Sequence, residues 1–210
     1  MAFDFKKEYK EFYMPKRKPE IVNVPKANYI AVRGVGDPNE EGGEYKAAIG
    51  LLYTIAFTLK MSRRIGHEIE GFFDYVVPPL EGFWWQPGVQ GIDYSRKNSF
   101  HWISVIRLPD FIKKEDFDWA IEEAQRKKKM DCSKVEFFTM DEGLCVQMMH
   151  IGSYDDEPES VALMDAYIEA EGYVNDLSGM RFHHEIYLSD ARKVEPARRK
   201  TVIRHPIKEL

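Results

Sequence analysis

The sequence has little cysteine, no excess of positive charge and no long apolar run. Its 210 residues include only two cysteines, whose spacing is not that of a metal site, so we expect a reducing compartment. The formal net charge is −5, whereas a nucleic-acid-binding surface needs basic residues to neutralise phosphates. No stretch reaches the roughly 18 apolar residues of a membrane span, and the first residues lack the apolar core of a signal peptide. These absences predict a soluble cytoplasmic protein that has neither a nucleic-acid partner nor a membrane partner.

Aromatic residues, in contrast, are abundant. The chain contains 11 Tyr, 13 Phe and 4 Trp, more than a core of this size requires, so part of this ring surface is expected to line something. Residues 1–20 interleave charges with aromatic rings and are expected to form an N-terminal arm that packs its rings onto the protein. The alternative is a partly ordered terminus. Residues 21–207 are expected to form a single domain.

The order of predicted elements repeats along the chain. Alternating apolar positions predict strands and a 3.6-residue period predicts helices, with Gly66, Pro158 and Gly172 at predicted helix ends. A hairpin is expected to turn at Asp141-Glu142-Gly143. The predicted segments are strand 27–37, helix 39–66, strands 71–79 and 99–111, helix 113–129, hairpin 133–156, helix 157–173, and strands 180–190 and 199–207.

Strand, helix, strand and strand therefore occur twice, at about 27–109 and 143–205. This order predicts an α+β fold of two duplicated strand–helix–strand–strand modules around a pseudo-twofold axis. Each helix would cover one face of its sheet, and the two remaining faces would form a concave floor with a central pocket.

The strand near residue 185 carries an unusual carboxylate. Side chains alternate along a strand, so His183, Glu185 and Tyr187 share one face, expected to be the open one. The other face, which includes Ile186, is mostly apolar and suits the helix-covered side. In an aromatic pocket, desolvation would raise the pKa of Glu185 and make it a usable general base or acid. Pairing with an arginine on a solvated sheet face is the alternative, and the pattern alone leaves both open.

Two further aromatic groups are candidates for such a pocket. In the first long helix, Tyr45, Ile49, Tyr53 and Phe57 follow at steps of four beside a second apolar stripe. Tyr53 either stands at the rim of a site or belongs to the core. The adjacent Trp84 and Trp85 cannot point the same way in a strand, so they serve either two core layers or a core and a site wall.

Three segments carry a family resemblance: "VPKANYIAVRGVGDPN", "PLEGFWW" and "HHEIYLSDARKVEPARRKTVIRHPI". Together they are similar to stand-alone GyrI-like small-molecule-binding proteins, relatives of the effector-binding domains of AraC- and MerR-type regulators. The resemblance covers about residues 20–207. It implies a pocket at the pseudo-twofold axis for flat, often cationic aromatic molecules, with a central acid that falls on Glu185. Some members resemble hydrolases that open the strained ring of DNA-alkylating cyclopropanoids and so protect the cell.

The resemblance leads to two main hypotheses for function. In a hydrolase, Glu185 would activate water, while Tyr53, with Tyr187 in reserve, would donate to the substrate carbonyl. In a binding module, the same pocket would hold hydrophobic cations without chemistry; a protein-interaction domain ranks last. Scattered histidines predict no metal, and no cofactor is needed. One of the paired tryptophans would face Glu185, but the sequence does not say which, nor does it fix the ligand or the oligomeric state. The candidate ligand-binding residues are Trp84, Trp85, Trp102, Tyr187, His183 and Phe57.

Overall fold

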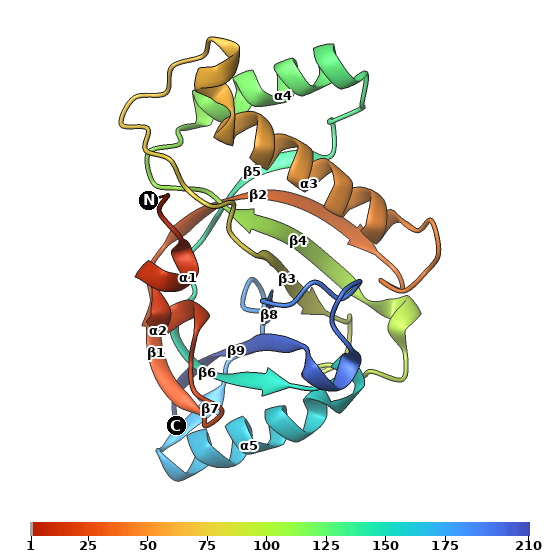
Figure 1. Cartoon of the computed structure of the whole chain (residues 1–210). Helices are drawn as coiled ribbons and strands as arrows, with labels where there is room; N and C mark the ends of the chain where they lie inside the picture. Colours follow the sequence, from red (N-terminus) through yellow and green to blue (C-terminus); the bar gives the residue numbers. More distant parts are fainter. Residues whose placement is uncertain (1) are drawn as a thin grey trace.

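The computed structural model describes residues 2–210 and shows an α+β fold in which helices pack on a large antiparallel sheet (Figure 1). Helical and extended segments follow the periodicity of the sequence closely. In chain order they are α1 (Phe5–Glu8), α2 (Lys10–Tyr13), β1 (Glu20–Val24), β2 (Ala27–Val35), α3 (Glu44–Lys60), η1 (Ser62–Ile65), β3 (Leu80–Trp85), η2 (Lys97–Ser99), β4 (His101–Arg107), α4 (Lys114–Lys128), β5 (Val135–Met140), β6 (Gly143–Ile151), η3 (Tyr154–Asp156), α5 (Glu157–Ala170), β7 (Tyr173–Asn175), β8 (His183–Tyr187), η4 (Pro196–Arg198) and β9 (Lys200–Glu209).

Within residues 2–210, nine strands form the sheet in the order β1-β6-β9-β8-β3-β4-β2-β5, with β7 paired to β9. The central pair is β3 and β8, where Gly82 lies opposite Glu185. Outward from this pair the order is β3-β4-β2 on one side and β8-β9-β6 on the other. Each half therefore runs strand, helix, strand, strand along the chain, as predicted. Duplication of one ancestral module stays a prediction.

The helix ends follow local rules that were legible in the sequence. Helix α3 begins with Glu44 and ends with Lys60, so its end charges complement the helix dipole. The 3₁₀ turn after it stops at Gly66, whose φ of 84° is left-handed. Helix α5 has Pro158 in its first turn, and Gly172 follows its end with a φ of 82°. The expected positions of Gly66, Pro158 and Gly172 at helix ends are confirmed, whereas α3 itself spans only Glu44–Lys60 of the predicted 39–66.

Helices α3 and α5 cover the same face of the sheet, at its two ends (Figure 1). Leu52 of α3 packs in the same cluster as Trp84, and Ile168 of α5 packs in a cluster with Ile203. Residues opposite each other in a sheet point to the same side, and Glu185 lies opposite both Gly82 and Ile203. Glu185 therefore points to the helix-covered face, in the gap between the two helices, and the prediction that it faces away from them is wrong.

Two other strand predictions need correction. Residues 71–79 do not form the predicted strand. Strand β3 begins only at Leu80, because the preceding Pro78 and Pro79 lack the N–H that a sheet ladder requires. The predicted hairpin around Gly143 also fails as a pair. Strand β5 pairs with β2, whereas β6 pairs with β1 and β9, so the turn between them joins distant parts of the described sheet.

The N-terminal arm closes the face opposite the helices. Phe5 of α1 and both Phe12 and Tyr13 of α2 are buried. All three side chains pack in one cluster with Ile186. The expectation that the arm packs its rings onto the protein is confirmed. Among residues 2–210, no helix combines the length and the apolar character needed to cross a membrane.

Candidate functional site

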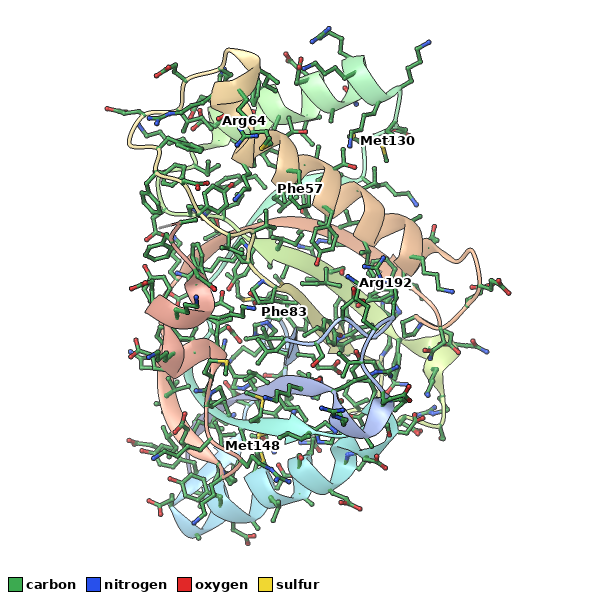
Figure 2. All side chains as sticks on the ribbon, in the orientation of Figure 1. Phe57, Arg64, Phe83, Met130, Met148 and Arg192 are labelled. Atoms are coloured by element: carbon green, nitrogen blue, oxygen red, sulfur yellow. The ribbon has the colours of Figure 1, made fainter. Side chains whose placement is uncertain are left out.

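A cavity of about 1140 Å³ lies on the helix-covered face, beside the central strands β3 and β8. This volume is sufficient for a drug-sized ligand, since such clefts measure roughly 300–1,000 Å³. Figure 2 shows Phe57 on α3 and Arg192 on the loop after β8, and both residues line the cavity. Its aromatic lining residues are Tyr45, Tyr53, Phe57, Trp84, Tyr94, Phe100, Tyr154 and Tyr187.

Glu185 lines the floor of this cavity, and two histidines that contact each other in series, His183 and His205, hold its carboxylate in place. Glu185 is only 8% exposed, and His183 Nε2 lies 2.9 Å from its Oε1. On the other side of the ring, His183 Nδ1 lies 2.6 Å from His205 Nε2. Burial, followed by the charge of His183, lowers the pKa of His205 well below its usual range, so His205 is neutral. The histidine pair fixes the orientation of the Glu185 carboxylate.

A second carboxylate, Glu157, lies beside Glu185 and was not predicted. Glu157 is the first residue of α5 and is 0% exposed. Its Oε2 accepts a hydrogen bond of 3.2 Å from the Tyr94 hydroxyl. Burial, followed by the charge of Glu185, raises the pKa of Glu157 well above its usual range. An acidic residue at a helix start is so common that this one gave no functional signal in the sequence.

The register of β3 decides which of Trp84 and Trp85 faces the cavity. Trp84 lines the cavity, and its Nε1 donates a 3.0 Å hydrogen bond to the Tyr187 hydroxyl. Trp85 points to the opposite face, where its ring lies 4.7 Å from that of Phe182. A side chain at Gly82 would collide with the Trp84 indole and the Tyr187 hydroxyl. The glycine therefore leaves room for this bond directly beside Glu185.

Trp102 also lies outside the cavity lining. Its side chain is 1% exposed and belongs to the core beneath α3. Its ring lies over Gly34, where a side chain would collide with it. We therefore drop Trp85 and Trp102 from the candidate wall and keep Trp84. His183 does not line the cavity either, so we drop it as a ligand contact; instead it bonds to Glu185 from behind.

The phenols occupy different depths. Tyr187 is partly buried in the cavity lining, and desolvation followed by the charge of Glu185 raises its pKa well above the usual range. Tyr154 contacts the Tyr187 ring edge-on at 5.8 Å, and burial raises its pKa to about 12. Tyr53 lies further out, stacked at 6.3 Å on the half-exposed Phe57. Burial also raises the pKa of Tyr53. All three phenols are therefore protonated hydrogen-bond donors at neutral pH.

The cluster of Glu157, His183 and Glu185 has the composition of a metal site. Hydrogen bonds to protein groups, however, explain how these side chains are held. Among the described residues, Glu157, His183 and Glu185 each offer one donor atom within 4.8 Å of the others, and this ligand set would suit a divalent transition metal. The His183–Glu185 and Tyr94–Glu157 hydrogen bonds, however, already occupy most of these atoms. We therefore assign no metal here.

Comparison with solved structures finds close relatives from Listeria innocua. One, described as a hydrolase, is 45% identical with a TM-score of 0.89, over 99% of this chain and 100% of that one. Another, described as an uncharacterized conserved protein, is 47% identical with a TM-score of 0.92 over the same shares. The C-terminal domain of EcmrR is 13% identical with a TM-score of 0.56, over 92% of this chain and 98% of that one, and so shares the fold.

The sequence itself also matches a family model. No curated protein is similar enough to match this chain. The model of the GyrI-like small molecule binding domain, however, matches residues 17–208, a span that includes the cavity floor and most of its described walls. The chain thus belongs to the GyrI-like small-molecule-binding family.

Proposed function

We propose that the protein is a cofactor-independent hydrolase that takes flat aromatic molecules into the cavity and opens cyclopropanoid-type electrophiles with water. The observation that carries this proposal is a buried carboxylate, Glu185, held by His183 on the floor of an aromatic cavity. Such a carboxylate is suited to act as a general base. The description of a 45% identical protein from Listeria innocua as a hydrolase supports the same class of activity.

The aromatic walls would bind the body of the substrate. Trp84, Tyr187 and Phe57 come from three different elements and line the same cavity. A flat ring stacked against them gains dispersion contacts, and it displaces water from the reacting carbon. Because Trp84 donates its N–H to Tyr187, the orientation of the indole is fixed before the substrate enters.

The chemical step needs one base and one hydrogen-bond donor. Glu185 would remove a proton from a water molecule as its oxygen bonds to the strained ring carbon. The ring C–C bond breaks, and its electron pair moves into the conjugated carbonyl, whose oxygen becomes negative. Tyr53 would donate its hydrogen bond to that oxygen, with Tyr187 in reserve, since the Tyr187 hydroxyl accepts from Trp84 and its own O–H is still able to donate. After the proton passes from Glu185 to the product, the net change is the addition of one water.

The test is the mass of the product. Purified protein incubated with a cyclopropanoid should yield a ring-opened product heavier by one water. In Glu185→Gln the rate should fall by about 10²–10⁴-fold, the usual contribution of a general base, while binding of a neutral flat aromatic remains. The matched control is Glu159→Gln, which changes an exposed glutamate on the same helix as Glu157. Equal product formation by wild type and Glu185→Gln would exclude the proposed base.

A second candidate is binding of hydrophobic cations without turnover. It is favoured by the close approach of Glu157 and Glu185 inside an aromatic cavity, since carboxylates and ring faces both attract cations. A flat cationic dye should then quench tryptophan fluorescence, and Glu185→Gln should weaken that binding. Quenching by the dye together with an unchanged cyclopropanoid mass would select this function over hydrolysis.

A further inference from the structure

Glu157 and Glu185 meet in a way that ordinary carboxylates avoid. Their carboxyl oxygens lie within 4.8 Å of one another, and both side chains are buried. Glu157 Oε1 is enclosed and has no hydrogen-bond partner among the described residues. Two ionised carboxylates at this separation in a buried site repel each other, which favours a proton on one of them.

The surroundings decide which carboxyl group carries that proton. Glu185 faces the cavity and receives the His183 N–H, which stabilises its ionised form. Glu157 is fully enclosed, with only the Tyr94 hydroxyl bonded to Oε2. The positive end of the α5 dipole favours ionisation of Glu157, but this effect is weaker than the cost of desolvating a fully buried carboxylate.

We propose that Glu157 and Glu185 share a single proton that resides on Glu157, so that Glu157 donates a hydrogen bond to Glu185 and positions it as the ionised base of the site. The functional part of this inference rests on the proposed hydrolase activity. Glu157 is then a positioning residue, because it acts on the substrate through Glu185. The raised pKa of Glu157 supports this assignment, since burial is its largest cause.

Other charged or titratable groups face the pair from each neighbouring element, and none of them reverses this assignment. Tyr45 comes from α3, and Tyr94 from the loop after β3. Arg199 lies over the Tyr154 ring at 5.4 Å rather than against either carboxylate. The titratable and charged groups around the pair and along the cavity are Lys6, Tyr45, Lys46, Tyr53, Lys60, Tyr94, Lys97, Tyr154, Asp155, His183, Tyr187, Asp190, Arg192, Arg199 and His205.

The first test detects the proton directly and needs no substrate. Infrared difference spectra between wild type and Glu157→Gln at neutral pH should show the carbonyl stretch of one protonated carboxylic acid. In Glu185→Gln this band should remain, but it should disappear at a lower pH than in wild type, because the neighbouring negative charge is gone. No such band at neutral pH, or a band kept by Glu157→Gln and lost in Glu185→Gln, would overturn the proposal. Stoichiometric metal in the wild type that is lost from Glu157→Gln would overturn it as well.

The second test measures positioning. In Glu157→Leu, Glu185 loses its hydrogen-bond donor, so the acid limb of kcat/KM for cyclopropanoid hydrolysis should shift to higher pH by about one unit. Glu157→Gln keeps a neutral donor and should return the limb toward the wild-type position. An unshifted limb in a folded Glu157→Leu protein contradicts the positioning role. If the wild type forms no product, the proposed hydrolase fails, while the infrared result still decides the proton on Glu157.

Discussion

His183 and His184 are neighbours on β8, yet they belong to two buried clusters on opposite faces of the sheet. His183 contacts Glu185 on the cavity side. His184 is 0% exposed on the other side, between Glu81 and Glu142. Both clusters contain two buried carboxylates and a histidine, which bonds to both carboxylates in the His184 cluster and to Glu185 alone in the cavity cluster. They differ in what balances the negative charge.

In the His184 cluster, carboxylates and cations match. The two ring nitrogens of His184 lie 2.9 Å from Glu142 and 3.0 Å from Glu81, so both nitrogens donate. Arg204 adds a 2.9 Å bond to Glu142. Burial alone would raise the pKa of Glu142, but the charges of His184 and Arg204 lower it to about 2. Burial opposes protonation of His184, yet the charge of Glu142 raises the pKa of His184 overall.

This balanced cluster also fastens the N-terminal arm. Arg204 donates to the Phe12 carbonyl at 2.8 Å, and Tyr13 donates to Glu81 at 3.1 Å. The cavity cluster offers its carboxylates a tyrosine hydroxyl and an imidazole ring, and no guanidinium is bonded to them among the described residues. We infer that matched charges serve a structural role, whereas unmatched carboxylates beside a cavity keep a proton or a ligand cation exchangeable.

The largest expected effect is on the free energy of unfolding, and it comes from the charge-matched His184 cluster. Arg204→Met removes the guanidinium and leaves Glu142 buried beside one cation fewer, so the free energy of unfolding should fall by about 3–5 kcal/mol. Denaturant unfolding monitored by tryptophan fluorescence measures the loss. In the double variant Arg204→Met/Glu142→Gln the excess charge is gone, and much of the stability should return. A double variant as unstable as the single one would break the charge-matching explanation.

Much of this fold could be predicted from the sequence, because its elements obey local periodicity. The alternation of β8 correctly separated His183, Glu185 and Tyr187 from His184 and Ile186. Alternation, however, says which residues share a face and not what lies above that face. The arm contributes to the opposite face the Phe12 carbonyl, which is 192 residues from its partner Arg204, and Tyr13, which is 68 residues from its partner Glu81. The sequence did not indicate which face the arm would cover.

The sequence indicated a site residue only where that residue was unusual for its secondary structure. Glu185 stood out because a mid-strand glutamate is unusual, and the structure places it on the cavity floor. Glu157 obeyed the rule that acids begin helices, so its burial against Glu185 could not be inferred. The apolar run before Pro78 imitated a strand, although the two prolines move the start of β3 to Leu80. A long-range contact decided the placement of Glu157 against Glu185, whereas the start of β3 has a local cause in the two prolines.

The next effect is the pH dependence of the free energy of unfolding, which arises from Glu157 in the cavity cluster. An unfolded chain titrates Glu157 near 4.5, whereas the folded protein holds its pKa well above that value. Between these two pKa values the folded state keeps a proton that the unfolded state has lost, so wild-type stability falls as pH rises. Relative to Glu157→Gln, the free energy of unfolding should fall by about 1.4 kcal/mol per pH unit above about pH 4.5.

Thermal and denaturant unfolding of both proteins, from about pH 4.5 to pH 7.5, measure this difference. Groups that titrate in both proteins, including His184 and Glu142, cancel in the comparison. The exposed substitution Glu159→Gln is the control for changing a glutamate near the start of α5. A constant difference between wild type and Glu157→Gln across this range would show that Glu157 is ionised when folded.

The smallest effect tests the same two faces one strand away, on β3. Trp84 lines the cavity and Trp85 packs on Phe182 behind the sheet. Trp84→Phe removes indole surface and the bond to Tyr187, so the affinity for a flat aromatic ligand should fall by about 0.5–1.5 kcal/mol, or roughly 2–12-fold in Kd. Trp85→Phe should leave Kd unchanged and retain ligand-induced quenching. Calorimetric titration of both variants measures Kd without relying on the altered fluorophores, and a larger loss in Trp85→Phe would mean that the ligand enters from the opposite face.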